Sequence, residues 1–282
     1  MADDRSLAVL RRRIEAELAD AGIPRSSLDA DLICTTVLGV SRSWLHCHGD
    51  EILSGEVIEV IERAGSRRSS REPLHYILGE CPFCEHRFAV GAGCLIPRPE
   101  TEFLVAAALE TFDRGTFVDW GTGSGCIAGS ILAARPESSA LAVDRSPRAL
   151  SVAWSNMRRL KVADRCLLWH CAVPERIPLN RCDMIVSNPP YIPTGDLDGL
   201  MDDVVRYEPT SALDGGEDGL DPYRVLLPWA EKVLRPGGWL WVEFGGKDQE
   251  PILSAIGSPG LSLQAVRPDL SGEPRLMGWR RV

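Results

Sequence analysis

The sequence predicts an α/β fold, in which a doubly wound, mostly parallel sheet follows a small helical bundle. From about residue 115 onward, short and nearly continuous apolar runs alternate with helical stretches. Such runs are typical of parallel strands that are covered on both faces. Over roughly the first 80 residues, apolar side chains recur at helical spacing instead. A glycine-rich turn then joins the first strand of the sheet to a helix.

The N-terminal segment is expected to form three short helices. Gly22 ends the first helix, and the second begins at Ser26 or Ser27. A third helix covers residues 57–64, and the run 65–70 is predicted to be a loop because it is rich in glycine and serine. The apolar stripe of the first helix consists of Leu7, Leu10, Ile14, Leu18 and Ala21.

The second part of the chain carries the predicted strands, and the domain boundaries follow from this change of pattern. We expect a helical bundle over residues 1–80 whose polar face is free to dock a partner, a linker or hairpin over 81–100, and a sheet domain over 101–282. The predicted strands are Phe117–Asp119, Leu141–Asp144, Cys166–Trp169, Met184–Val186 and Trp239–Glu243.

The composition is that of an ordinary globular protein, with 44% hydrophobic and 25% charged residues among 282. No apolar run approaches the ~18 residues that a membrane helix needs. The start of the chain carries acids where a signal peptide carries basic residues, so a cytoplasmic protein is expected. The net charge of −9 disfavours a nucleic-acid substrate, because binding to phosphates depends on lysine and arginine.

The nine cysteines are interpreted as reduced thiols, because the chain shows no export signal. Cys81 and Cys84 have the spacing of a zinc-binding pair. A structural zinc site usually brings a second clean pair, which the sequence lacks, so a turn with two thiols is favoured over a metal site.

A glycine-rich turn follows the first predicted strand, and an acid ends the second. Glycines let the backbone turn tightly and approach a ligand closely. Asp144 is expected at the carboxyl end of the neighbouring strand, where its carboxylate can accept hydrogen bonds from both hydroxyls of a ribose. The pattern therefore predicts a nucleoside-containing ligand. The turn contributes Gly121, Thr122, Gly123, Ser124 and Gly125.

The tetrad Asn188-Pro189-Pro190-Tyr191 follows the strand that ends near Val186. The prolines fix φ and donate no backbone hydrogen bond, so the carbonyls of this stiff segment are free to accept. Asn188 adds a side-chain carbonyl, and Tyr191 offers an aromatic face to a flat group. Two acceptors can hold the N–H bonds of a planar NH2 group and direct its lone pair at a methyl donor.

This chemistry leaves several functions open. The group that receives the methyl can be a side-chain amide, or the amino group of adenine or cytosine in a flipped base. A third possibility is a protein that binds the methyl donor without catalysing a transfer. The absence of a basic tract in the sequence favours the amide.

Several motifs together resemble the HemK/PrmC-type protein-glutamine methyltransferases, which modify peptide chain release factors. The glycines spaced Gly-x-Gly-x-Gly, with an acid two residues ahead, have the form seen in class I methyltransferases. The motifs that carry the resemblance are Gly121–Gly125, Asp144, Asn188–Tyr191, Glu72–Gly79, Leu95–Glu102, Tyr207–Pro209 and Gly215–Leu220.

The resemblance implies a class I, seven-stranded methyltransferase domain over residues 101–282, with S-adenosylmethionine as cofactor. It also implies methylation of the glutamine in a release factor's Gly-Gly-Gln loop, by an enzyme expected to be a monomer. The implied catalytic residues are Asn188, Pro189 and Tyr191. The substrate contacts add Pro190, Arg98 and Glu100. The cofactor contacts are Gly121, Thr122, Gly123, Ser124, Gly125, Asp144, Val173 and Asn188.

The chain departs from the family pattern at three places. Ala172-Val173 stands where members often carry an acid and an aromatic near the adenine. Cys81–Cys84 replaces aromatic residues. Phe244–Lys247 follows the fifth predicted strand where a Gly-Tyr-Gly is more usual.

Overall fold

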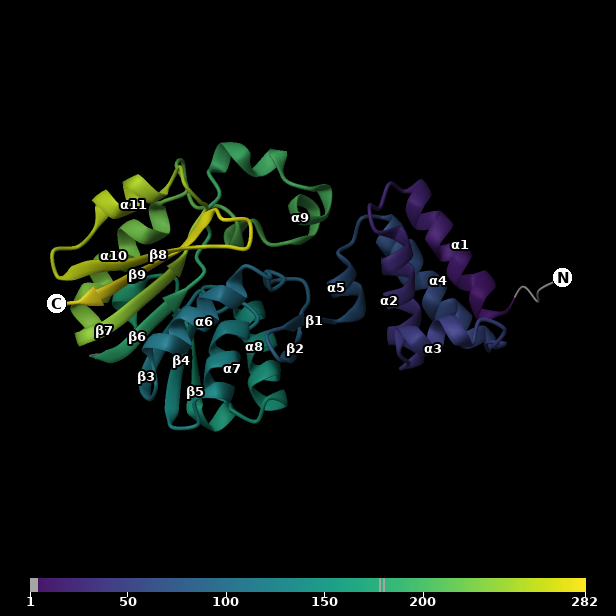
Figure 1. Cartoon of the computed structure of the whole chain (residues 1–282), viewed down its shortest axis with the longest axis horizontal. Helices are drawn as coiled ribbons and strands as arrows, with labels where there is room; N and C mark the ends of the chain where they lie inside the picture. Colours follow the sequence, from purple (N-terminus) through teal and green to yellow (C-terminus); the bar gives the residue numbers. More distant parts are fainter. Residues whose placement is uncertain (1–4, 178, 180) are drawn as a thin grey trace. The chain divides into compact units, whose positions relative to one another are not determined.

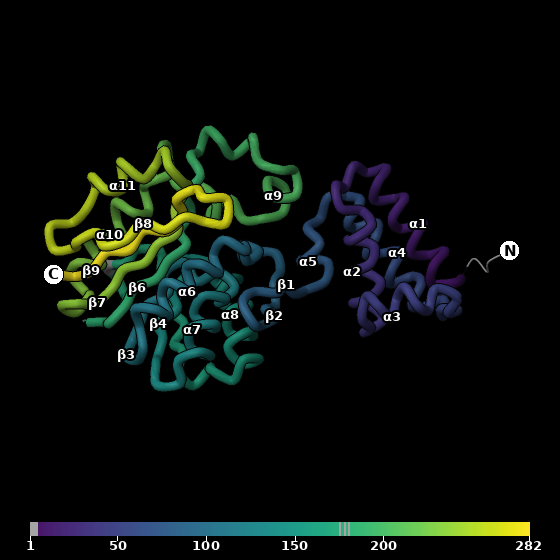
Figure 2. Tube along the Cα trace, in the orientation of Figure 1, coloured from purple at the N-terminus to yellow at the C-terminus, as the bar shows by residue number. Residues whose placement is uncertain are grey.

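The computed structural model describes residues 5–177, 179 and 181–282 and contains two compact units. The first extends to Gly79 and also includes Met201–Tyr207. The second contains Glu80–Leu200 and Glu208–Val282. Figure 1 and the trace in Figure 2 show the path of the chain through each unit.

The first unit, called here the helical unit, is built around α1, which buries Leu7, Leu10, Ile14 and Leu18 of the predicted stripe, whereas Ala21 follows the end of the helix and is only partly buried. The stripe packs with apolar residues of α2 and α4 in one separate core. The structure adds three short helices, α3, α5 and α9, to the three that were predicted. The helices of this unit are α1 (Leu7–Asp20), α2 (Ser26–Leu38), α3 (Arg42–Cys47), α4 (Gly55–Ser69), α5 (Leu74–Leu78) and α9 (Asp202–Tyr207).

The prediction of a loop over residues 65–70 is wrong, because α4 continues to Ser69. Tertiary contacts outweigh the low helix propensity of this run. At Gly65 the absence of a side chain lets α1 approach, since a Cβ there would lie 2.8 Å from Ile14 Cδ1. Arg68 is buried one turn later and donates a 2.7 Å hydrogen bond to Asp29.

Helix α9 belongs to the helical unit although it lies far along the chain. Arg68 donates from Nη1 to Asp203 at 2.7 Å, and the Tyr207 hydroxyl donates to the Ser70 carbonyl at 2.9 Å. The boundaries drawn from the sequence did not include this segment. Helical periodicity cannot detect it, because α9 has only six residues.

The second unit, called here the catalytic unit because it contains all of the predicted catalytic residues, has a seven-stranded sheet of order β5-β4-β3-β6-β7-β9-β8. The first five are parallel, and β9 pairs antiparallel with both β7 and β8. All five predicted strands are present. The strands are β3 (Gly115–Trp120), β4 (Ser138–Asp144), β5 (Cys166–His170), β6 (Cys182–Ser187), β7 (Leu234–Glu243), β8 (Leu261–Pro268) and β9 (Pro274–Arg281).

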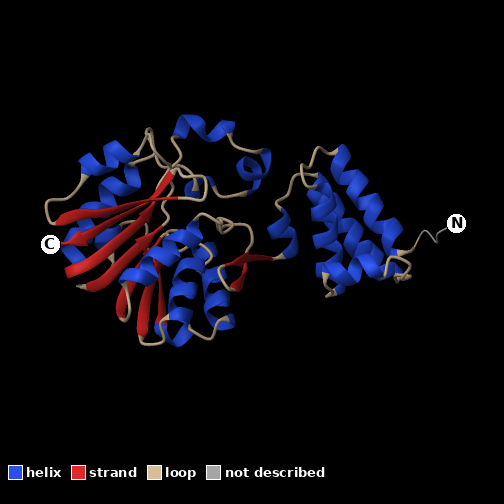
Figure 3. Cartoon of the chain, viewed as in Figure 1, coloured by secondary structure: helices blue, strands red, loops and turns tan. Residues whose placement is uncertain are grey.

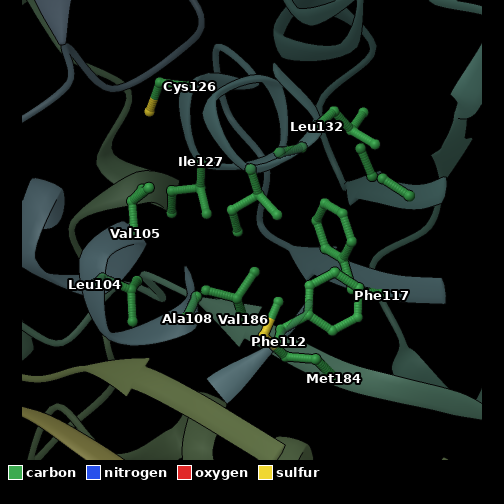
Figure 4. Close-up of a cluster of buried hydrophobic side chains, with 14 of the residues drawn as sticks. Leu104, Val105, Ala108, Phe112, Phe117, Cys126, Ile127, Leu132, Met184 and Val186 are labelled. Atoms are coloured by element: carbon green, nitrogen blue, oxygen red, sulfur yellow. The ribbon is translucent and has the colours of Figure 1, made fainter. Parts of the chain in front are cut away.

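Helices cover both faces of this sheet, as Figure 3 shows. Alternate strand residues point to opposite faces, so Phe117 packs in one apolar core and Val118 in the other. Figure 4 shows α6 and α7 side chains meeting Phe117, Met184 and Val186 in the first core. The helices are α6 (Thr101–Thr111), α7 (Cys126–Ala134), α8 (Pro147–Arg159), α10 (Asp221–Val233) and α11 (Glu250–Ile256).

The segment predicted as a linker or hairpin begins with a hairpin of β1 (Glu80–Phe83) and β2 (His86–Ala89). Cys84 lies between these strands with φ +50°. Short 3-10 helices elsewhere in the catalytic unit span Ala163–Arg165, Pro174–Arg176, Thr194–Gly199 and Thr210–Ala212.

The architecture confirms the predicted doubly wound α/β domain preceded by a helical region. Strand β3 lies between β4 and β6, so the chain order reverses beside it. In open α/β sheets, ligands bind at such a reversal, outside the carboxyl ends of the strands. Among the described residues, no helix has the length and apolar character needed to cross a membrane.

Candidate active site

A pocket opens at the carboxyl ends of β3, β4 and β6, where the sheet order reverses. Its empty volume, open mouth included, is about 900 Å³, which lies within the size range of small-molecule sites. The lining brings together residues of the glycine turn (Gly121, Thr122, Gly123, Ser124), of the β4 end (Asp144, Arg145, Ser146), of the tetrad (Asn188, Pro189, Pro190) and of the preceding linker (Gly93, Cys94, Leu95, Pro97, Arg98).

The glycine turn is held against the end of β4 by its own backbone. The N–H groups of Gly121 and Thr122 both donate to the Val143 carbonyl at 2.9 Å. Gly121 and Gly123 have φ of +76° and +54°, a region that L side chains rarely adopt. The turn therefore presents backbone to the pocket.

Gly125 lies outside the pocket lining and has a different role. It has φ +79°, and a Cβ there would lie 2.7 Å from Met157 Cε and 3.1 Å from Ala153 Cβ. The missing side chain thus lets the start of α7 pack closely on α8, which is the packing role of a glycine in such turns.

The Asp144 carboxylate is tied to the turn and to the next helix. Its Oδ2 accepts from the Gly123 N–H at 2.9 Å, and its Oδ1 accepts from the Ser146 N–H at 2.8 Å. Burial raises the pKa of this carboxyl, although the two N–H groups oppose the shift. Each carboxylate oxygen retains a lone pair, so the side chain can still accept from a ligand.

Asp119 lies on β3, two residues before Gly121, and is fully buried. Its Oδ2 accepts from the Thr122 hydroxyl at 2.7 Å and from the Ala128 N–H at 3.1 Å. Its Oδ1 has no hydrogen-bond partner within the part of the chain that the structure describes. Burial raises the pKa of Asp119 to about 7. Asp119 does not line the pocket, so its role in the site is to hold the glycine turn through Thr122 and the start of α7 through Ala128.

The tetrad begins one residue beyond β6, next to the glycine turn. A Cβ at Gly121 would lie 4.0 Å from the Asn188 carbonyl oxygen. The Asn188 side-chain Nδ2 donates to the Thr101 hydroxyl at 2.9 Å, and the Ser187 hydroxyl donates to the Trp120 carbonyl at 2.6 Å. Pro189 follows Asn188 in the lining of the same pocket.

Tyr191 does not line this pocket, although the sequence led us to expect its ring beside a flat substrate group. The ring packs against the second apolar core, and its hydroxyl donates to Glu243 at 3.3 Å. Burial is the main reason that the pKa of Tyr191 is raised, and the nearby Glu243 carboxylate adds to the shift.

The remaining predicted residues occupy different environments. Arg98 lines the pocket, and its guanidinium donates to the Glu208 carboxylate at 2.6 Å. Glu208 is 5% exposed and also accepts from the Ile96 N–H at 3.1 Å. Glu100 and Val173 lie outside the lining, whereas Ala172 belongs to it.

Sequence reasoning missed three residues of this region as site residues. Thr101 and Glu208 lie inside motifs that carried the family resemblance, so only their individual roles were overlooked. Glu243 is an acid at the end of an apolar strand, the same signal that identified Asp144. Among the described residues, no group of three or more histidine, cysteine or acidic side chains is arranged to hold a metal ion.

Two family models match the chain. The model described as the PrmC N-terminal domain matches residues 10–79. The model described as the methyltransferase small domain matches residues 99–207. The two matches fall on the helical unit and on the glycine turn with the tetrad.

Relatives similar to nearly the whole chain carry one name. The release factor glutamine methyltransferase of Geobacter sulfurreducens is 39% identical over 264 residues, which cover 93% of this chain and 92% of that protein. The one of Rhodospirillum rubrum is 39% identical, covering 99% of this chain and 87% of that protein. The one of Cereibacter sphaeroides is 41% identical, covering 93% and 94%.

A solved structure agrees with the fold. The crystal structure of a methyltransferase from Pyrococcus furiosus matches 68% of this chain and 87% of its own with a TM-score of 0.52, at 17% sequence identity. The methyltransferase fold is thus shared beyond recognisable sequence similarity. From the identities over nearly full length, the chain belongs to the family of release factor glutamine methyltransferases.

Proposed function

We propose that this protein transfers a methyl group from S-adenosylmethionine to the side-chain amide nitrogen of a glutamine in the Gly-Gly-Gln loop of a peptide chain release factor. One observation carries the proposal. Residues 121–124 of the glycine turn and Asn188–Pro190 of the tetrad line a single pocket, so a nucleoside-bearing methyl donor and an NH2 acceptor can meet there. The names of the relatives support glutamine as the acceptor.

The residues present fit S-adenosylmethionine. The positive φ angles of Gly121 and Gly123 leave backbone open to a ligand. Asp144 has lone pairs left for ribose hydroxyls. We therefore assign cofactor binding to the glycine turn and Asp144, with Ala172 rather than Val173 at the adenine end.

S-adenosylmethionine, when bound, supplies a methyl group made electrophilic by its sulfonium sulfur. The chain's own residues prepare the acceptor. An amide nitrogen is a poor nucleophile because its lone pair is delocalised into the carbonyl. In our proposal the Asn188 side-chain carbonyl and the Pro189 backbone carbonyl each accept one N–H of the glutamine amide. The nitrogen can then pyramidalise and aim its lone pair at the methyl group.

A dedicated general base is not required in this mechanism. The methylated amide nitrogen carries an acidic proton and loses it readily after the transfer. Asn188 and Pro189 therefore act by orientation and by hydrogen bonding, which strengthen as positive charge develops on the nitrogen.

The helical unit is proposed to dock the release factor, and the catalytic unit to carry the chemistry. We expect the enzyme to act as a monomer in the cytoplasm, where release factors work. The formal net charge of −9 supports a protein substrate over nucleic acid, because nucleic-acid binding relies on basic surface.

The test is to offer the enzyme labelled S-adenosylmethionine with four substrates: a release factor, the same factor with its Gly-Gly-Gln glutamine changed to alanine, duplex DNA and single-stranded nucleic acid. Label confined to the unaltered factor, located on the glutamine by mass spectrometry, is the expected result. Label on nucleic acid would identify an amino-methyltransferase of bases. Cofactor binding without any label would identify a non-catalytic module.

A further inference from the structure

The Glu243 carboxylate ends β7 and is almost fully buried, with 1% exposure. Both of its oxygens have partners. Oε2 accepts from the Thr101 hydroxyl at 2.7 Å, and Oε1 accepts from the Tyr191 hydroxyl at 3.3 Å. A buried carboxylate is costly, and neither partner carries a positive charge. Stability alone therefore does not explain why the Glu243 carboxylate is buried here.

The position of Glu243 follows from the sheet register. Ser187 of β6 pairs with Val242 of β7, so Asn188 and Glu243 leave adjacent parallel strands at the same level. Thr101, the first residue of α6, lies between them. Three elements distant in sequence thus converge on one hydroxyl group.

Glu243, Thr101 and Asn188 form a row of hydrogen-bonded side chains, and the chemistry of the three groups determines the direction of each hydrogen bond. An ionised carboxylate can only accept, so the single hydroxyl hydrogen of Thr101 is directed at Glu243. The Thr101 oxygen can then only accept from Asn188, which presents Nδ2 to it at 2.9 Å. An inverted amide would set Oδ1 against the lone pairs of Thr101. The ionised row therefore fixes which end of the Asn188 amide faces Thr101.

We propose that Glu243 and Thr101 are positioning residues, which orient the Asn188 amide so that its Oδ1 accepts the N–H of the substrate amide. This inference rests on the proposed function. In the inverted orientation Asn188 would turn an NH2 donor toward the NH2 of the substrate, and no hydrogen bond would form. The hydrogen bonds of Glu243 and Thr101 thus leave the Oδ1 end of the Asn188 amide, and not its NH2 end, to face the substrate.

The row is sensitive to protonation. Burial raises the pKa of Glu243 to about 7. A protonated Glu243 can donate to Thr101, whose hydrogen is then free to point at Asn188 and to accommodate the inverted amide. The acceptor orientation is therefore lost as the pH falls through the pKa of Glu243. The titratable and charged groups that act on this carboxyl or are acted on by it are Glu100, Tyr191, Tyr223 and Arg275.

Thr101→Val provides the first test, because valine keeps the shape of threonine and removes the hydroxyl. We expect kcat for release factor methylation to fall about tenfold, the equivalent of one hydrogen bond lost in the transition state. The cofactor Kd, measured by calorimetry, is expected to change less than about twofold. Thr101→Ser, which restores the hydroxyl, should recover most of the lost kcat.

Thr111→Val is the matched control, because Thr111 ends the same helix and its hydroxyl accepts from Trp241 Nε1 at 2.9 Å. It tests for an indirect effect of a weakened α6 and is expected to leave kcat unchanged. An equal loss of kcat in Thr111→Val and Thr101→Val would overturn the positioning role.

A second readout does not depend on turnover. The side-chain NH2 signals of Asn188, assigned by their absence in Asn188→Ala, should be protected from solvent exchange in amide NMR spectra of the wild type. They should shift with a midpoint near the pKa of Glu243, about 7. Thr101→Val should lose the protection from exchange. In the wild type we expect kcat to fall as the pH drops through the pKa of Glu243. Glu243→Gln should lose both this fall in kcat and the pH-dependent shift of the NMR signals.

The outcomes separate the two proposals. A wild type that leaves the release factor unlabelled refutes the proposed function, and the NMR signals still decide the orientation of Asn188. Protection that persists in Thr101→Val refutes the row of hydrogen bonds. An active wild type whose kcat is unchanged in both Thr101→Val and Glu243→Gln refutes its role in catalysis.

Discussion

The Asp144 carboxylate accepts a 2.9 Å hydrogen bond from the backbone N–H of Gly123, so the acid and the glycine turn form one unit. The sequence suggested two separate contributions, a flexible turn and a ribose-binding acid. In the structure the acid also holds the turn in place, and its other oxygen holds the start of α8 through Ser146. Removing the carboxylate therefore affects both functions.

Asp144→Ala is expected to raise the cofactor Kd by about tenfold to a hundredfold, because hydrogen bonds to a charged group contribute ~1.5–3 kcal/mol. Asp144→Asn, which can keep one acceptor for Gly123, should have a smaller effect. Isothermal titration calorimetry measures both. Asp113→Asn, at an acid whose side chain is 94% exposed, is the control for the change in net charge. An unchanged Kd in Asp144→Ala would remove Asp144 from the cofactor site.

Gly125→Ala is expected to destabilise the catalytic unit in two ways. A left-handed φ costs an alanine ~1–2 kcal/mol. The contact with Ala153 adds ~1–3 kcal/mol, since the end of Met157 can move but the α8 backbone cannot without repacking. Urea unfolding followed by tryptophan fluorescence measures the change, because every tryptophan except Trp44 lies in this unit.

The matched control for Gly125 is Gly272→Ala. Gly272 lies in the same unit with φ +85°, and a Cβ there would meet nothing within 4 Å. It therefore carries only the backbone cost of ~1–2 kcal/mol. If both variants lose the same free energy of unfolding, the packing role of Gly125 is wrong.

Asp119 predicts a pH dependence of stability. Its folded pKa, about 7, lies above the unfolded value of 3.8, so the native state binds more protons between these values. The stability that this difference contributes is present in full below about pH 4 and is lost as the pH rises through about 7. Wild-type unfolding free energy in this unit should therefore fall over that window.

Asp119→Asn should reduce this decline, because the neutral amide has no proton to release. The comparison is the difference in urea midpoint between about pH 5 and about pH 8 for wild type and variant. Glu243, whose pKa is also raised to about 7, contributes a decline of its own that the variant retains. A variant with the full wild-type decline would show that Asp119 is ionised at low pH in the native state.

Local patterns explain how much of the fold the sequence predicted. The five parallel strands are continuous apolar runs, and their order along the chain places the glycine turn and the tetrad at one sheet edge. The position of both segments beside one pocket follows from that topology alone. Strands β8 and β9 were not located, because they lie at the antiparallel edge, where exposed and buried residues mix.

The contacts that could not be predicted join residues far apart in sequence. Thr101 and Glu243 are separated by 142 positions, and no spacing rule relates them. The same holds for Tyr191, whose hydroxyl turns to Glu243 and away from the expected substrate side. In α4, the buried ion pair of Arg68 with Asp29 helps to keep helical a run whose composition favours a loop.

Arg68 lies between two acids, Asp29 on α2 and Asp203 on α9, at 2.7 Å from each. Arg68→Met keeps much of the side-chain volume but leaves Asp29 without its cation, and it leaves Asp203 only the longer 3.8 Å contact with Arg71. Breaking a buried pair by removing one partner costs ~3–5 kcal/mol. We expect the helical unit to lose about this much stability and α9 to lose its attachment to α4.

Hydrogen exchange over Met201–Tyr207 measures the attachment of α9, and the fluorescence of Trp44 reports on the rest of the helical unit. Arg63→Met is the control, because Arg63 lies on the same helix with an exposed side chain. Asp203→Asn should loosen α9 with a smaller loss in the unit as a whole, since Arg68 keeps its bond to Asp29. Slow exchange over 201–207 that persists in Arg68→Met would mean that the apolar contacts and the Tyr207 hydroxyl hold α9 without the ion pair.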